Sequence, residues 1–251
     1  MTRLKASRLI VQALVLAMLG ACASGGGGGG GGGGDAVSPP PPRPPSATPR
    51  PPAVPLPPMP GPATGPTPDL NSREYLDHWA PAGINANAAW VYQNGHGEGV
   101  LVGVIDDGID SDHPELIGRI SPRSTDIAPG RNALETTLSH GSEIASLIAG
   151  NFNGAQTVGI AYEATILAVR ADNGSGGFPD TYLANAINYA VAEGVRVINL
   201  SLGSPSAPSA ALQNAIRNAT QSGVIFVVSA GNSGASAGHP NYPGFLEPAQ
   251  S

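Results

Sequence analysis

Cysteine is almost missing from this chain of 251 residues, because Cys22 is the only one. An internal disulfide is therefore excluded, and so is a zinc site built on cysteines. Positive charge is also scarce: Lys and Arg number 12 against 18 Asp and Glu, which gives a formal net charge of −6. A chain this acidic argues against nucleic acid as a partner.

The N-terminal region has an apolar run, residues 9–19, that is too short to span a bilayer comfortably. It follows a basic start, so we predict that residues 1–21 are a signal peptide. The next residues, Leu19-Gly20-Ala21-Cys22, resemble the bacterial lipobox, in which the cysteine carries the lipid. We expect an exported lipoprotein of the cell envelope, at the outer membrane or cell surface, anchored to the membrane through Cys22. An ordinary signal peptide cleaved near Ala23 is the alternative.

Residues 22–68 hold little that can pack into a core. Residues 25–34 are all glycine, and 16 of the 26 prolines lie between Pro39 and Pro68. Such segments cannot bury enough apolar surface to fold, so we predict a flexible tether that becomes a polyproline II stalk. The globular part is expected at residues 69–251, which is enough for one domain.

The globular part alternates between short apolar runs and amphipathic segments. The run that begins at Val100 and ends at Asp106 is rich in β-branched residues and flanked by glycines, as in a strand buried on both faces. Further strands are predicted at 165–170, 195–200 and 224–228, and helices at 86–92, 141–149, 181–193 and 210–221. This alternation predicts an α/β fold of three layers, α/β/α, around a mainly parallel sheet.

Three polar residues fall where the predicted elements meet one edge of the sheet. Asp106 ends the first strand, His140 opens the helix that follows, and Asn232 comes just after the last strand. Because the loops at the carboxyl ends of parallel strands line one crevice, we expect these side chains to converge. An aspartate that orients a histidine, a histidine that takes a proton and an amide that stabilises an oxyanion suit general-base catalysis. Each residue alone also has a structural explanation, as a cap, a helix start or a turn former.

Four segments in this order resemble the motifs of the subtilisin family of serine proteases. They are residues 104–116, 140–146, 197–203 and 229–232. The resemblance implies a serine endopeptidase acting on proteins or peptides. In it, Asp106 is the charge-relay acid, His140 the general base and Asn232 the oxyanion-hole donor.

The resemblance also implies a substrate cleft. Ser201-Leu202-Gly203 and Ser229-Ala230-Gly231 are expected to wall the primary specificity pocket. Ser175 and Gly176 lie in a segment similar to the edge that pairs with the substrate backbone. A peptide bound in this way gains main-chain hydrogen bonds whatever its side chains are.

No cofactor is required by this resemblance, which allows calcium as a structural ion. Glu115 and Asn153 fall where the family places calcium ligands. A hard oxygen site needs several more groups, so we assign no metal ligand from the sequence.

The sequence departs from the family pattern in two respects. Asp107 stands where most members have Ser or Thr, and we expect it to point to the opposite face of the strand from Asp106. The family's nucleophile motif, Gly-Thr-Ser-x-Ala-x-Pro, does not occur among the 251 residues. We therefore expect a fragment of a longer protease, incomplete at the C-terminus and inactive as it stands.

Two other functions are compatible with parts of the pattern. A catalytically inactive, membrane-tethered peptide-binding module would keep the cleft without the nucleophile. A nucleotide-binding α/β domain is disfavoured, because Gly97 and Gly99 precede the first strand and the carboxylates of Asp106 and Asp107, which repel phosphate, follow it.

Overall fold

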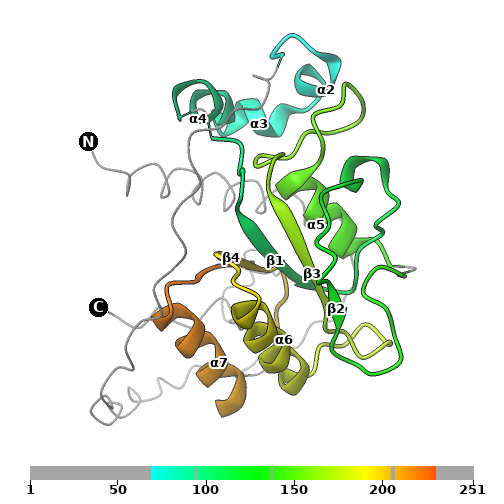
Figure 1. The fold of residues 1–251 in the computed structure, drawn as a ribbon, viewed down its shortest axis with the longest axis vertical. Helices are drawn as coiled ribbons and strands as arrows, with labels where there is room; N and C mark the ends of the chain where they lie inside the picture. Colours follow the sequence, from blue (N-terminus) through cyan, green and yellow to red (C-terminus); the bar gives the residue numbers. More distant parts are fainter. Residues whose placement is uncertain (1–68, 94, 137, 205–206, 230–251) are drawn as a thin grey trace, which may run out of the picture.

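The computed structural model describes residues 69–229 except 94, 137 and 205–206, which are drawn in colour in Figure 1. Several sequence predictions lie outside the described residues. They concern the signal peptide, Cys22, the tether, Ala230, Gly231 and Asn232.

Five parallel strands form the centre of the fold, in the order β2-β3-β1-β4-β5. They are β1 (Leu101–Asp106), β2 (Thr125–Asp126), β3 (Thr165–Arg170), β4 (Val197–Leu200) and β5 (Ile225–Val228). The longest strands lie side by side, with Asp106 of β1 opposite Arg170 of β3. The carboxyl ends of these strands therefore lie along one edge of the sheet.

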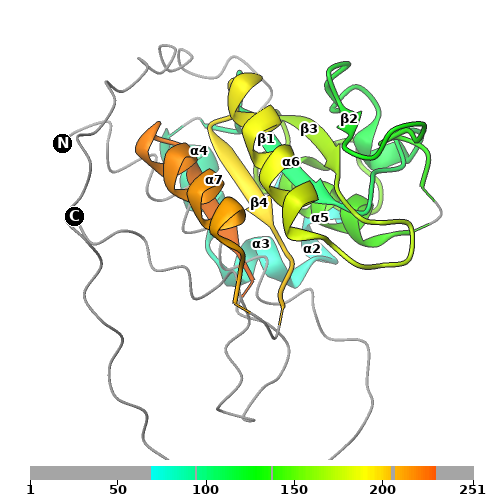
Figure 2. The ribbon, with the colours of Figure 1, turned by 90° about the horizontal axis from the view of Figure 1, so that it is seen from below.

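Helices cover both faces of this sheet. On one side lies α5 (His140–Ala149), and on the other lie α6 (Asp180–Ala192) and α7 (Ala210–Gln221), as Figures 1 and 2 show. Each face has its own buried apolar cluster, one around α5 and one around α6 and α7. The predicted three-layer α/β/α architecture with a parallel sheet is confirmed.

Strand β1 shows why the chain takes this form locally. Val102 and Val104 pack into the cluster on the α5 side, and Ile105 packs into the cluster on the α6 side. Gly103 faces α6 so closely that an added Cβ would lie 3.5 Å from the Cβ of Ala190. Because both faces are covered, the strand needs an uninterrupted apolar sequence rather than an alternating one.

An aromatic cluster supports the segment that enters the sheet. The segment holds α2 (Arg73–Leu76), α3 (Trp79–Gly83) and α4 (Ala86–Gln93). The Trp90 ring lies 6.0 Å from that of Tyr75 and 5.7 Å from that of Tyr162, both edge-on. The indole N–H of Trp90 also donates to the carbonyl of Ile160 at 2.9 Å. The buried ring thus has both its apolar and its polar requirements met.

The structure adds elements that the sequence pattern did not predict. These are α2, α3, the short 3-10 helix η1 (Pro114–Leu116) and strand β2. All are five residues or shorter, so none spans enough sequence to show a period. None of the helices in the described part is long and apolar enough to cross a bilayer.

Candidate active site

Asp106 lies at the carboxyl end of the central strand with its side chain 1 % exposed. Its two carboxylate oxygens lie 2.9 and 3.0 Å from Nδ1 of His140. The backbone N–H of Asp107 donates a further hydrogen bond, 2.9 Å long, to one of these oxygens. A buried carboxylate is costly unless it is hydrogen-bonded, and here both oxygens have partners.

His140 is the first residue of α5, and its side chain is 40 % exposed. With Nδ1 at the carboxylate, Nε2 is the ring nitrogen left to exchange a proton with a substrate or nucleophile. The next residue, Gly141, allows the helix to begin this close to the strand. A Cβ there would collide with the carbonyl oxygen of Gly108 and lie 3.2 Å from the Cβ of Asp106.

Asp107 corrects one expectation from the sequence. Its carboxylate does not point away from the site but accepts a hydrogen bond of 2.9 Å from the backbone N–H of Gly141. Strand β1 ends at Asp106, so the alternation of side chains between faces does not extend to the next residue. Asp107 thus joins the loop after β1 to the start of α5, where a negative charge also favours the helix dipole.

The contacts in this site change the pKa values of His140 and Asp107. The hydrogen bond that His140 donates to Asp106 raises the pKa of His140 above 6.5; desolvation opposes this rise, and the charges of Asp106, Asp107 and Glu143 add to it. Burial raises the pKa of Asp107 above 3.8, while the hydrogen bond from Gly141 opposes the rise. The stabilisation that the His140 pair gives the fold is therefore full below pH 6.5. It is lost as the pH rises through the higher pKa of the folded state.

The predicted pocket segments meet where β4 and β5 end. These strands pair in parallel, and the Ser229 hydroxyl donates to the carbonyl of Leu202 at 3.1 Å. The Ser201 hydroxyl bonds instead to the side chain of Asn199, which is fully buried. The structure therefore places Ser229, from the predicted wall segment 229–231, in contact with Leu202 of the other wall segment, 201–203.

The predicted substrate edge, Ser175 and Gly176, lies in a tight turn after β3. The side-chain oxygen of Asn173 accepts hydrogen bonds from the backbone N–H groups of Ser175, at 2.9 Å, and Gly177, at 3.1 Å. The N–H of Asn173 donates to the Gly177 carbonyl at 2.8 Å. A Cβ on Gly177 would lie 2.9 Å from the Asn173 amide nitrogen, so a larger residue there would have to displace the Asn173 side chain.

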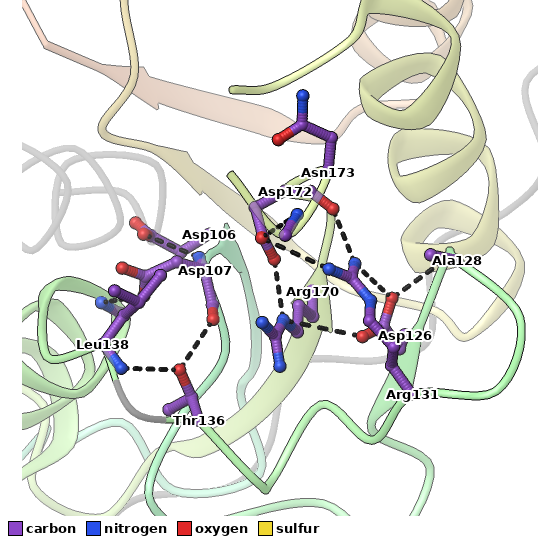
Figure 3. Close-up of polar contacts among 12 residues, drawn as sticks. Asp106, Asp107, Asp126, Ala128, Arg131, Thr136, Leu138, Arg170, Asp172 and Asn173 are labelled. Atoms are coloured by element: carbon purple, nitrogen blue, oxygen red, sulfur yellow. Dashed lines mark hydrogen bonds and ion pairs between the residues drawn. The ribbon is translucent and has the colours of Figure 1, made fainter. Parts of the chain in front are cut away.

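A buried network of four charged side chains lies beside the Asp106–His140 pair, and the sequence analysis missed it. Its members are Asp126, Arg131, Arg170 and Asp172 (Figure 3). Both aspartate side chains are 1 % exposed or less. Removing one partner of such a buried pair costs about 3–5 kcal/mol. The one sequence signal was Arg170, a charge at the end of an apolar strand with Asp172 two residues later.

The network keeps the carboxylate of Asp172 ionised. Burial alone raises the pKa of Asp172, but hydrogen bonds from Arg170 and Gly174 and the charges of both arginines outweigh it. The pKa of Asp172 therefore lies below 3.8.

Two further buried carboxylates, those of Glu115 and Glu74, lie outside the Asp106–His140 site. Glu115 is fully buried, and neither of its carboxylate oxygens has a hydrogen-bond partner. Burial and the charge of Glu74 raise its pKa, while the Thr157 backbone and Asn153 side chain lower it. Glu74 accepts hydrogen bonds from the backbone of residues 153 and 154. In the described part of the chain, neither carboxylate is paired with an arginine.

Oxygen donors of this kind suit a hard cation such as calcium, which takes six to eight of them. The buried, unpartnered Glu115 carboxylate is the feature that a cation would satisfy. No group of three or more His, Cys, Asp or Glu side chains gathers at one point among the described residues. A calcium ion here would thus depend on backbone carbonyls and Asn153 for the rest of its ligands.

Sequence comparison assigns residues 97–248 to the subtilase family, the peptidase family S8. This match covers more than half of the chain. The chain belongs to the subtilase family. Among curated relatives, it is 35 % identical over 179 residues to thermitase of Thermoactinomyces vulgaris, covering 71 % of this chain and 61 % of thermitase. It is 40 % identical over 147 residues to subtilisin Savinase of Lederbergia lenta, covering 59 % of this chain and 52 % of that relative.

Solved structures of subtilase relatives have the same fold as this chain. The crystal structure of fervidolysin from Fervidobacterium pennivorans, a keratinolytic enzyme related to subtilisin, matches with a TM-score of 0.58 and 27 % identity. The match covers 72 % of this subtilase chain and 28 % of fervidolysin. The S41 psychrophilic protease matches with a TM-score of 0.53 and 31 % identity, over 60 % of this chain and 51 % of that one. The chain thus spans less than two thirds of the length of these relatives.

The protonation of His140 can be measured without any catalysis. We predict that the pKa of its imidazole lies above 6.5 and falls in Asp106→Asn, because that variant loses the charge and the strongest acceptor. The measurement is an NMR titration of the ring carbon and nitrogen signals. Asp112→Asn, which removes a nearby exposed charge, is the control and should leave the pKa unchanged. An equal shift in both variants would contradict the pairing.

Proposed function

We propose that this chain carries the acid and the base of a subtilisin-like serine endopeptidase. The observation that supports it most is the contact of His140 Nδ1 with both oxygens of the buried Asp106 carboxylate. This contact fixes the ring tautomer with the proton on Nδ1, so that Nε2 acts as the base. The half-exposed ring allows a nucleophile to reach that nitrogen.

In the proposed reaction, Nε2 of His140 takes the proton of a serine hydroxyl as the serine oxygen attacks the substrate carbonyl carbon. Asp106 stabilises the imidazolium that forms. The side chain of Asn232 donates a hydrogen bond to the oxyanion of the tetrahedral intermediate. His140 then gives the proton to the leaving amine, and water repeats the sequence to release the acyl group.

The nucleophile of this reaction is proposed to lie in a further segment of a longer polypeptide. The family's Gly-Thr-Ser motif does not occur among these 251 residues, and the curated relatives extend well beyond the matched region. The 251 residues then supply the acid, the base, the oxyanion donor and part of the cleft, and they do not hydrolyse peptides alone.

The proposed substrates are proteins or peptides bound in extended form. The segments 201–203 and 229–231 form the walls of the primary pocket, a placement favoured by the contact between Ser229 and Leu202. Ser175 and Gly176 offer backbone groups to the substrate main chain, which does not depend on the substrate's side chains.

We further propose that Cys22 carries the lipid anchor of an exported protein and that residues 23–68 hold the protease away from the membrane. A diacylglyceryl-modified cysteine bears more than one acyl chain, which is enough for stable attachment. The proline-rich part of the tether reaches about 90 Å if it is fully polyproline II.

A structural calcium ion is proposed at Glu115, Glu74 and Asn153. Its charge would compensate the two buried carboxylates, and its ligands would join η1 and the loop after α5 to the entry helix α2. The ion has no part in the peptide-bond chemistry.

Replacing His140 with Ala in the full-length protein should abolish detectable peptide hydrolysis, since loss of the base of such a triad lowers kcat by about a millionfold. The reason is the loss of the proton acceptor, while the half-exposed position leaves the core intact. Circular dichroism checks folding, and His113→Ala is the control that should keep its activity. If the wild-type full-length protein binds peptides but cleaves none, the chain is a peptide-binding module instead.

Replacing Cys22 with Ser should move the protein from the membrane fraction to the soluble fraction after export. The double variant Cys22→Ser/Ser24→Cys tests whether the position of the cysteine matters. It carries a thiol outside the lipobox, so we expect this variant in the soluble fraction as well. The measurement is fractionation with immunodetection. Unchanged membrane association of Cys22→Ser would contradict the anchor.

Removing calcium with EDTA should lower the Tm of the protein by about 5–10 °C, because a ligand that binds only the folded state stabilises it. In Glu115→Gln the added chelator should have little further effect. Glu143→Gln, which removes an exposed carboxylate, is the matched control and should respond as the wild type does. A Tm that EDTA does not change in the wild type would exclude this site.

A further inference from the structure

We propose that Arg131 is a positioning residue that holds the turn 173–177 in the shape that receives the substrate main chain. The part of this inference that concerns substrate binding rests on the proposed protease function. Arg131 lies in the loop that precedes His140, whereas the turn follows β3, so the contact joins two loops at the same edge of the sheet.

Arg131 makes two hydrogen bonds to Asp172, the residue just before the turn, and a third to Asp126 of β2. Its Nη1 donates to a carboxylate oxygen of Asp172 at 3.2 Å, and its Nη2 donates to the Asp172 carbonyl at 2.5 Å. The same Nη2 donates to Asp126 at 2.9 Å. The guanidinium therefore binds the main chain just before the turn as well as two buried carboxylates. Figure 3 shows it between β2 and the end of β3.

The guanidinium also lies close to the turn itself. Gly174 has a φ of +81°, and an added Cβ would lie 3.5 Å from Nη1 of Arg131. The N–H of Gly174 donates to the carboxylate oxygen of Asp172 that Arg131 also binds. Asp172 is thus fixed from one side by Arg131 and, through its other oxygen, by Arg170 at 2.7 Å.

Three of the turn's bonds then follow from the position of Asp172. Its oxygen holds Gly174, and the next residue, Asn173, holds Ser175 and Gly177. The hydrogen bonds within the turn lead back to Asp172 and Asn173, while Phe178, just after the turn, packs against the apolar cluster around α6 and α7. The charged contacts of Asp172 thus hold the start of the turn, and the apolar contact of Phe178 holds its end. The substrate main chain is proposed to pair with backbone groups of this turn, and groups that are already ordered bind at a lower entropic cost, which makes the order of the turn a determinant of substrate affinity.

The test compares two charge-neutral double variants of the full-length protein. Arg131→Met with Asp126→Asn removes one positive and one negative charge, so that Arg170 still pairs with Asp172. Arg123→Met with Glu193→Gln is the matched control, because it removes an ion pair of 2.6 Å that joins the loop before β2 to the C-terminal end of α6, away from the turn. Circular dichroism and Tm establish that both variants fold.

The first measurement is hydrogen–deuterium exchange of the peptide that covers residues 172–177. We expect exchange about tenfold faster in the Arg131→Met/Asp126→Asn variant, because the turn loses a charge-assisted hydrogen bond. We expect no change in the Arg123→Met/Glu193→Gln variant. Unchanged exchange in the Arg131 variant would overturn the proposal, whatever the protein hydrolyses.

The second measurement is steady-state kinetics with two substrates. For a pentapeptide that extends along the edge, the Arg131 variant should show a KM about tenfold higher with kcat nearly unchanged. For a single-residue ester, which does not reach the turn, both constants should stay as in the wild type. An equal loss on the two substrates would overturn the proposal, since it would mean a general structural role. If the wild type hydrolyses neither substrate, the proposed function fails and the link to substrate fails with it, while exchange still decides whether Arg131 orders the turn.

Discussion

The burial of the Asp106 carboxylate is the constraint on which this edge of the structure depends. A charge at the end of a strand covered on both faces needs donors directed at it, and His140 and the backbone of Asp107 supply them. These contacts require α5 to begin within hydrogen-bond reach of β1. The strand, the loop after it and the first turn of the helix therefore form one unit rather than three independent elements.

Asp107 and Gly141 make this unit rigid in complementary ways. The carboxylate of Asp107 binds the N–H of Gly141, and the missing side chain of Gly141 lets the helix approach the loop. The hydroxyl of Thr136, just before the helix, donates to the carbonyl of Asp107 at 3.0 Å. His140 is thus held from the chain before it and the chain after it, which is how an imidazole keeps one orientation while half of it faces solvent.

Charge balance along the same edge follows from the arrangement of the strands. Asp106, Asp107, Asp126 and Asp172 are all buried close together, and their mutual repulsion has to be offset. Arg131 and Arg170 offset Asp126 and Asp172, while the imidazole and helix start of α5 interact with the other two. The two arginines and their aspartates thereby form a fixed ionic support beside the site, whereas His140 and Asp107 have raised pKa values.

The sequence by itself determined the layers and the chemistry of this subtilase chain. Apolar runs and helical periods fix which segments are buried, and strands such as β3 were predicted with their observed bounds because burial on both faces leaves an unmistakable pattern. The same pattern located Asp106 and His140 at one edge of the sheet. Only the tertiary structure decided the orientation of Asp107, the existence of the two-residue strand β2 and the network around Arg131. Those features depend on the paths of loops that bring distant residues together, and no local period in the sequence records such contacts.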